Sequence, residues 1–135
     1  TIAARTAKAV LPHSRRRTDA EWRRVLDHDV YRVTRLGATE RPFSRHLEPS
    51  THYHCACCNT KLFAHEHRYD SGSGWPSFSA ALNDAHVARR VESDGRTEIA
   101  CAACNAHLGH VFNDGPCAPH HERHCVNALA LAECR

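Results

Sequence analysis

The sequence predicts a mainly β protein built from antiparallel strands and folded as one domain. Its 135 residues suit a single domain. Short apolar runs are separated by turn signals, with no regular alternation of strands and helices. The hydrophobic fraction of 41% predicts a small core that needs additional support, which eight cysteines can provide.

Composition and charge disfavour membrane and nucleic-acid roles. No run of 18 or more apolar residues is present, so we expect no membrane span. The net charge of +3 is modest, and the basic residues are dispersed apart from Arg15–Arg17, so nucleic acid is not an expected partner. We expect a basic tail over residues 1–17, a domain over residues 18–135, and a cytoplasmic monomer. The alternative is an organelle, with the tail as a transit remnant.

Two short helices are expected at the start of the domain. Thr18 and Glu21 have the spacing of a capping box, in which each side chain bonds the other residue's backbone N–H. Apolar residues follow Trp22 at the third and fourth positions, as on one helix face. The next segment favours either a stop or a second helix over Val30–Val33, with Gly37 as a helix end.

A hairpin and a glycine-rich loop are expected in the middle of the chain. His52–Cys57 and Lys61–Phe63 are expected strands, and the Cys55–Cys58 turn between them is a hairpin tip suited to a metal. The segment Tyr69–Phe78 contains two glycines and a proline, which predict an ordered loop. This loop is expected to present Trp75.

Further antiparallel strands are expected in the second half. Val91 and Thr97–Cys101 flank an Asp94-Gly95 turn, which is a good hairpin signal. His110–Phe112 is expected as another strand. Arg123–Ala132 is expected as one long final strand, whose alternate residues face opposite sides of a sheet.

Two Cys-x-x-Cys pairs predict a metal site. Their members are Cys55, Cys58, Cys101 and Cys104, and four thiolates in this spacing suit tetrahedral Zn²⁺. Protein would fill all four positions, so the zinc is expected to be structural. The 42 residues at positions 59–100 separate the pairs, against about 15–20 in a compact zinc ribbon. The metal would therefore clip two distant hairpins together. Ordinary buried thiols are the alternative.

Cys125 is the candidate reactive cysteine. It lacks a Cys-x-x-Cys partner and shares a predicted strand face with Arg123, whose charge would favour the thiolate. Asn127 lies on the same face and can donate a hydrogen bond. His107 and His110 can donate protons near a reacting oxygen. The alternative is a small core cysteine and an unrelated histidine pair.

Several motifs are specific in combination. They are Glu40-Arg-Pro-Phe43, Tyr69-Asp-Ser-Gly-Ser-Gly-Trp-Pro-Ser-Phe78, His107-Leu-Gly-His-Val-Phe112, Asp114-Gly-Pro116 and Arg123-His-Cys-Val-Asn127, with the two cysteine pairs. Over about Thr18–Leu131 the chain resembles the methionine-R-sulfoxide reductase B family. The resemblance implies two antiparallel sheets clipped by a structural zinc, with short N-terminal helices. It also implies reduction of the R epimer of methionine sulfoxide, free or in oxidised proteins.

The resemblance also implies roles for individual residues. Cys125 is expected to attack the sulfoxide sulfur and take its oxygen as a sulfenic acid, with Arg123 stabilising the thiolate. Other side chains are expected to hold the substrate. They are His107, His110 and Asn127 for the sulfoxide oxygen, and Trp75 and Phe112 for the remainder of the methionine side chain.

The chain departs from the family pattern at the recycling step. Ser73 stands where many members carry a resolving cysteine, so the sulfenic acid cannot form that disulfide. Cys117 is the best substitute, and Cys57 and Cys134 are weaker candidates. Thioredoxin or another thiol is the expected reductant, and direct reduction of the sulfenic acid is the alternative.

A competing hypothesis is a non-catalytic zinc-knuckle module that binds protein or nucleic acid. It explains the four zinc cysteines. It does not require Cys125, Arg123 and the Trp75 loop together.

Overall fold

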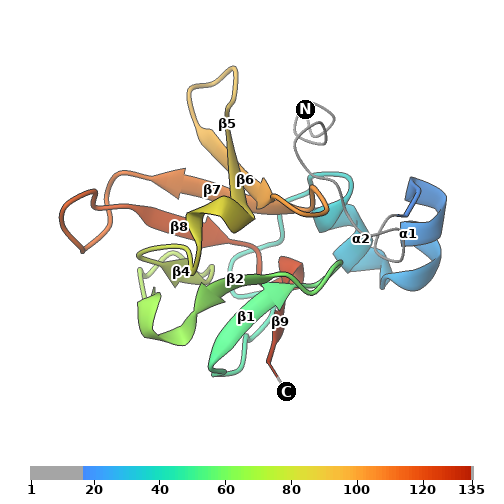
Figure 1. Ribbon diagram of the computed structural model, residues 1–135, viewed down its shortest axis with the longest axis horizontal. Coiled ribbons are helices and arrows are strands. Elements are labelled where there is room, and N and C mark those ends of the chain that lie inside the picture. Colours follow the sequence, from blue (N-terminus) through green and yellow to red (C-terminus); the bar gives the residue numbers. More distant parts are fainter. Residues whose placement is uncertain (1–16, 135) are drawn as a thin grey trace.

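The computed structural model describes residues 17–134, which form two antiparallel sheets with two short helices at one side (Figure 1). The helices are α1 (Asp19–Val25) and α2 (His28–Thr34). The strands are β1 (His52–Cys55), β2 (Lys61–Ala64), β3 (Arg68–Tyr69), β4 (Ser77–Phe78), β5 (Val87–Val91), β6 (Thr97–Cys101), β7 (His107–Phe112), β8 (Arg123–Val126) and β9 (Leu131–Glu133). Three single-turn 3-10 helices also occur: η3 (His65–His67), η4 (Asp84–His86) and η5 (Ala128–Ala130). The predicted mainly β class is confirmed.

The predicted basic tail lies, apart from Arg17, outside the described residues. Within residues 17–134, no helix has the length and apolar character needed to cross a membrane.

The first helix is defined by its cap. Thr18 Oγ1 accepts the Glu21 N–H at 3.2 Å, and Glu21 Oε1 accepts the Thr18 N–H at 2.9 Å, so the predicted capping box is confirmed. Trp22 is buried as the predicted apolar stripe requires, whereas Val25, a further member of that stripe, is exposed. The second predicted helix is present as α2, and Gly37 turns the chain after it with a φ of 76°.

The strands form one small and one large sheet. The three-stranded sheet has the order β2-β1-β9, and the six-stranded sheet has the order β3-β4-β8-β7-β6-β5. The Asp94-Gly95 turn joins β5 to β6 as predicted, and β7 begins at His107, three residues before the predicted strand. Figure 1 shows the two sheets facing one another, with α1 and α2 beside them. The strand β8, which carries Cys125, belongs to the six-stranded sheet.

The prediction of one continuous final strand over Arg123–Ala132 is wrong. β8 ends at Val126 in the six-stranded sheet, η5 follows, and β9 pairs with β1 in the three-stranded sheet. Within β8 the predicted alternation is confirmed, because His124 and Val126 are buried while Arg123 and Cys125 are partly exposed. The chain thus leaves one sheet for the other immediately after Cys125.

Side-chain hydrogen bonds fix this crossing between sheets. The Asn127 backbone N–H and its Nδ2 both donate to the Leu108 carbonyl at 2.9 Å. The Glu40 carboxylate accepts the backbone N–H groups of Ala128 at 2.7 Å and Leu129 at 2.9 Å. These contacts replace the ladder hydrogen bonds that a continued strand would make, and buried backbone groups need such partners. Local alternation in the sequence could not indicate them.

Aromatic side chains fill the space between the sheets. Phe63 of β2 stacks on Phe78 of β4, with ring centroids 4.4 Å apart, and His124 of β8 meets Phe63 edge-on at 5.6 Å. His124 is 0% exposed, on the opposite face of β8 from Cys125. The strand β8 therefore turns His124 into the core.

We expect the substitution His124→Phe to remove a pH-dependent loss of stability. Burial holds the pKa of His124 below its usual value; Arg89 acts in the same direction, and Glu122 and Asp84 oppose it. For a base with a depressed folded pKa, the unfolded state binds more protons just below about pH 6.5, so stability falls as pH drops through that range. Urea unfolding of both proteins from about pH 7.5 to pH 5 measures this difference.

The variant should gain stability relative to the wild type as the pH falls, since a phenyl ring keeps the edge contact with Phe63. The exposed His46 provides the control, and His46→Phe should follow the wild-type curve. Parallel pH profiles for wild type and His124→Phe would contradict this account.

Candidate functional site

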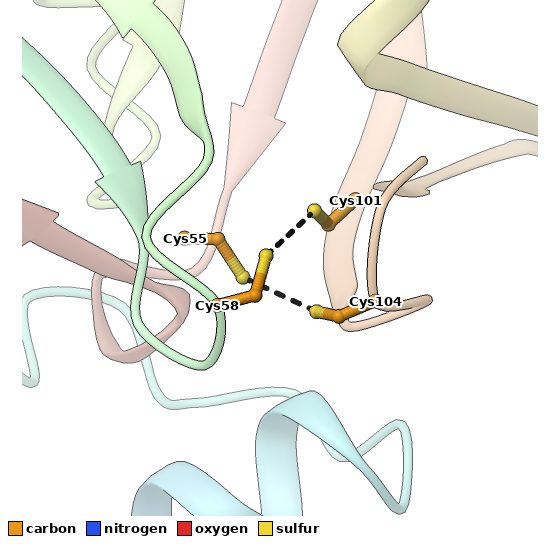
Figure 2. A group of neighbouring side chains, drawn as sticks. All are labelled: Cys55, Cys58, Cys101 and Cys104. Carbon is orange, nitrogen blue, oxygen red and sulfur yellow. Dashed lines mark hydrogen bonds between the residues drawn. The ribbon is translucent and has the colours of Figure 1, made fainter. Parts of the chain in front are cut away.

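The four predicted zinc cysteines converge between the two sheets. Cys55 Sγ lies 3.5 Å from Cys104 Sγ, and Cys58 Sγ lies 3.6 Å from Cys101 Sγ (Figure 2). All four sulfurs lie within 4.8 Å of one another, and all four residues are buried. These separations exceed a disulfide bond and approach the ~3.8 Å between sulfurs that tetrahedral zinc with bonds of about 2.3 Å requires. The donor set therefore fits Zn²⁺, which would join β1–β2 to β6–β7.

The two knuckles share one backbone conformation. In each, an asparagine follows the second cysteine in the left-handed region, Asn59 and Asn105 both at φ 68°. Each asparagine N–H donates to the carbonyl of the first cysteine, at 3.0 Å for Cys55 and 2.8 Å for Cys101. Asparagine tolerates this conformation better than most residues. The repeated Cys-x-x-Cys-Asn pattern is a sequence signal that the predictions did not use.

Arg35 connects the helices to this cluster. Its Nη2 donates to the Cys104 carbonyl at 2.9 Å, and its Nη1 lies 3.6 Å from Cys104 Sγ. A positive charge beside four thiolates stabilises their negative charge. The guanidinium also lies 5.0 Å from the centroid of the Trp22 ring. Spacing alone did not identify Arg35 as a neighbour of the metal site.

A row of polar side chains crosses one face of the six-stranded sheet. Directly opposite residues of antiparallel strands share a face. From β4 through β8 and β7 to β6, the row consists of Ser77, Cys125, His110 and Glu98. Phe112 and Arg123 are opposite each other two residues further along the same strands. The register therefore brings together four residues predicted for the site: Cys125, His110, Arg123 and Phe112.

The environment of Cys125 is less favourable to a thiolate than predicted. Burial raises the pKa of the Cys125 thiol, and the charge of Arg123 and hydrogen bonds from Ser73 and Arg123 oppose this shift without overcoming it. Arg123 therefore favours the thiolate, as predicted, but burial outweighs its effect. One reason is Asp114, whose carboxylate offsets part of the guanidinium charge.

Arg123 is held in place by two neighbours. Its Nε donates to Asp114 Oδ1 at 2.8 Å and its Nη2 to Asp114 Oδ2 at 3.2 Å, a bidentate pair. The guanidinium carbon lies 4.5 Å from the centroid of the Phe112 ring. These contacts fix the direction of a long, flexible side chain beside Cys125. Asp114 was part of a predicted motif but had no predicted role.

Carboxylates orient the two predicted histidines. His107 Nδ1 lies 2.6 Å from Glu98 Oε2, and His110 Nε2 lies 2.7 Å from Glu92 Oε1. An ionised carboxylate accepts only, so each of these ring nitrogens is the donor. The rings meet edge-on at 5.8 Å and both line a cavity of about 560 Å³. In each ring the second nitrogen remains available for a proton transfer or a water.

Two sequence motifs meet at Trp75. Trp75 Nε1 donates to the Glu40 carbonyl at 3.1 Å, and the Phe43 N–H donates to the Gly74 carbonyl at 2.7 Å. A Cβ on Gly74 would lie 2.6 Å from Pro42 Cβ and 2.8 Å from Phe43 Cε2, so only glycine fits. This close approach explains why the Glu40–Phe43 and Gly74–Trp75 segments occur together.

Trp75 is brought beside the active strand by its own chain neighbours. The Pro76 carbonyl accepts the Val126 N–H at 2.9 Å, and Ser77 pairs with Cys125. A cavity of about 380 Å³ lies next to Trp75 and is lined also by Phe43, which is 81% exposed. The indole thus lies between the strand that carries Cys125 and a cavity whose lining also includes the charged Arg68 and Asp70.

Asn127 has a different set of contacts from the predicted one. Its Oδ1 accepts the Glu40 N–H at 3.1 Å, and its Nδ2 donates to the Leu108 carbonyl. The oxygen and the nitrogen of the Asn127 amide are therefore both bonded to backbone groups, those of Glu40 and Leu108. Contact between Asn127 and a substrate stays a prediction. The structure adds Glu40, which connects Asn127, Trp75 and η5.

The three remaining cysteines, Cys57, Cys117 and Cys134, lie in different parts of the fold. Cys117 is exposed on the β7–β8 loop. Burial raises the pKa of Tyr69, the charge of Arg123 opposes this shift, and the charges of Asp114, Cys117 and Cys125 add to it. Cys57 adjoins the first zinc knuckle, and Cys134 follows β9 in the other sheet. Ser73 occupies the position beside Cys125 that a resolving thiol would need.

Comparison with known proteins decides the family. The SelR domain family matches residues 26–134, which span most of the chain. The chain belongs to the SelR domain family. It is 50% identical over 121 residues to the "Peptide methionine sulfoxide reductase MsrB" of Herminiimonas arsenicoxydans, covering 85% of this chain and 88% of the relative.

Two further relatives carry the same name. The protein of Pseudomonas putida (strain GB-1) is 50% identical over 117 residues, covering 82% of this chain and 88% of the relative. The protein of Hahella chejuensis (strain KCTC 2396) is 44% identical over 122 residues, covering 86% and 87%. These matches confirm the family predicted for this SelR domain protein and the prediction that it is an enzyme.

We expect Glu40→Ala to weaken both the fold and the site. The substitution leaves the N–H groups of Ala128 and Leu129 without their acceptor, at about 1–3 kcal/mol for each buried donor. It also loosens the segment whose carbonyl holds Trp75. Urea unfolding should show a loss of at least about 2 kcal/mol. The exposed Glu48 is the control, and Glu48→Ala should change stability by less than about 0.5 kcal/mol. Equal stability of the two variants would show that Glu40 does not hold the crossing.

Proposed function

We propose that this SelR domain protein reduces methionine-R-sulfoxide to methionine through Cys125, with protein-bound residues as substrate and the free amino acid as a further substrate. The observation that carries this proposal is the cross-strand row that sets Cys125 opposite His110 and beside Arg123. This arrangement places a nucleophilic sulfur, a proton donor and a fixed positive charge on one face. Reduction of a sulfoxide requires these three elements.

The chemical step transfers one oxygen and two electrons. The Cys125 thiolate attacks the sulfoxide sulfur while a proton reaches the sulfoxide oxygen. The oxygen moves to Cys125 as a sulfenic acid, and methionine leaves as the thioether. Cys125 sulfur is oxidised by two electrons and the substrate sulfur is reduced by two. The proton lost by the Cys125 thiol is balanced by the proton gained by the sulfoxide oxygen.

The neighbouring residues divide the work of this step. His110, held by Glu92, and His107, held by Glu98, deliver or position the proton directly or through water. Arg123 favours the thiolate at the moment when the buried thiol ionises. Burial keeps Cys125 mainly protonated before substrate binds, which protects it from unselective oxidation.

Aromatic side chains hold the substrate's apolar part. The Trp75 indole offers a platform for the methyl group, with a sulfur–aromatic gain of about 0.3–1.5 kcal/mol. Phe112 is directly opposite Arg123 on the neighbouring strand, and its ring contacts the guanidinium. The exposed Phe43 beside Trp75 supports a protein-bound substrate, because its ring can cover the apolar parts of a peptide next to the oxidised methionine.

Cys117 recycles the enzyme in this scheme. Its thiolate attacks the sulfenic acid of Cys125, a disulfide forms, and the oxygen leaves as water. Cys117 is exposed on the loop that leads from β7 into β8, the strand of Cys125, which supports this route. Thioredoxin or another thiol then reduces the disulfide. Because Ser73 cannot act as the resolving residue, this route uses a different loop from that of many family members.

A single turnover without reductant tests the proposal. The enzyme is mixed with a peptide containing methionine-R-sulfoxide, and the protein and peptide are analysed by mass spectrometry. We expect one methionine per chain and a Cys117–Cys125 disulfide. The S epimer should not react, and Cys125→Ser should form no methionine.

Variants separate the nucleophile from the recycling step. Cys117→Ser should still form one methionine and should leave a sulfenic acid on Cys125 that dimedone traps. Adding Ser73→Cys to Cys117→Ser should restore a disulfide, now between position 73 and Cys125. Methionine formation by Cys125→Ser would overturn the proposed activity. A disulfide that excludes Cys117 in the wild type would overturn only the recycling route.

A further inference from the structure

A second group of metal-binding side chains lies on the outer face of the three-stranded sheet. His52 and His54 are two residues apart on β1, so both point away from the core, into which Tyr53 and Cys55 point. The register pairs Tyr53 with Glu133, and the Cys134 N–H donates to the His52 carbonyl at 3.3 Å. Cys134 therefore lies opposite His52, and strand pairing brings the three residues together although the 78 residues at positions 56–133 separate β1 from Cys134.

The donor atoms of this group are already close. One ligand atom from each of His52, His54 and Cys134 lies within 4.8 Å of the other two. The two imidazole rings have centroids 5.6 Å apart and are tilted by 45°. The four cysteines of the first metal site satisfy the same 4.8 Å limit. Small side-chain rotations bring such atoms to the ~3.3–3.8 Å separations that a tetrahedral ion imposes.

The hydrogen bonds of His54 prepare it as a ligand. Its Nδ1 lies 3.0 Å from Asn59 Oδ1, which can only accept, so Nδ1 carries the proton. Nε2 then carries the lone pair. This atom is shielded from solvent and has no hydrogen-bond partner among residues 17–134. A histidine that donates one ring N–H to a protein oxygen and offers the other nitrogen is the usual arrangement at metal sites.

The backbone of Cys134 is held by two hydrogen bonds to the Ser50 side chain. Its N–H donates to Ser50 Oγ at 2.7 Å, and Ser50 Oγ donates to the Cys134 carbonyl at 3.2 Å. These bonds anchor the backbone at the end of β9, so the sulfur keeps its position over β1. A ligand whose backbone is held in this way loses little conformational entropy when a metal binds.

We propose that His52, His54 and Cys134 form a second metal site, which binds a borderline or soft transition-metal ion such as Zn²⁺ with the fourth position open to solvent. Two imidazoles and one thiolate suit this class of ion and exclude Mg²⁺ and Ca²⁺, which prefer oxygen. The open position distinguishes this site from the closed set of four cysteines. The site also gives Cys134 a role apart from recycling, because it lies on a different sheet from Cys125.

Titration with Co²⁺ tests the proposal. Protein with one Zn²⁺ in the four-cysteine site is titrated with Co²⁺ under reducing conditions, and its absorption spectrum and metal content are measured. We expect one further metal ion per chain, with a thiolate-to-cobalt charge-transfer band and the visible bands of a four-coordinate ion. Cys134→Ser should abolish the charge-transfer band, and His52→Ala should weaken Co²⁺ binding by more than about tenfold.

Controls separate this site from surface histidines and from misfolding. His46→Ala removes an exposed histidine outside the group and should leave the titration unchanged. Each variant must retain one Zn²⁺ and cooperative unfolding; if Cys134→Ser fails this criterion, His52→Ala supplies the decisive comparison. Absence of a second equivalent would overturn the proposal. So would a charge-transfer band that persists in Cys134→Ser, or Co²⁺ binding as tight in His52→Ala as in the wild type.

Discussion

The fold depends on four sulfurs that join the tips of two hairpins from different sheets. Cys55 and Cys58 belong to the three-stranded sheet, and Cys101 and Cys104 belong to the six-stranded sheet. The hydrophobic fraction of the chain is 41%, and a chain of this size has a small core. A metal ion at this point closes a long loop and restricts the unfolded chain strongly. The metal ion would thereby fix the six-stranded sheet, which carries Cys125, against the three-stranded sheet, which contains β9.

The strand that carries Cys125 combines two effects that oppose each other. Cys125 is partly buried, and burial raises the pKa of its thiol. Arg123 opposes this effect, but Asp114 shares its charge. The balance leaves the pKa of the thiol above its ordinary value. Glu40, remote in sequence, then fixes both the end of the strand and the indole through hydrogen bonds.

Local patterns predicted much of the fold, and long-range contacts account for what they missed. The capping box at Thr18 and the Asp94-Gly95 turn involve only near neighbours, so the sequence was sufficient for them. The cysteine spacing likewise predicted the metal site. The break after Val126 was missed because it depends on Glu40, 88 residues from Ala128. The raised pKa of Cys125 was missed because it results from burial of the thiol. The sequence shows the nearby Arg123 but does not show this burial.

Removal of the zinc is the most direct test of the central claim that the metal holds the two sheets together. The variant Cys134→Ser is used, so that the proposed second site lacks its thiolate ligand. A strong chelator is added under reducing conditions, and metal content, near-ultraviolet circular dichroism and sulfoxide reduction are followed together. We expect tertiary structure and activity to be lost in proportion to the zinc, and both to return when one Zn²⁺ per chain is added back. A metal-free protein that keeps its cooperative unfolding and its activity would contradict the account.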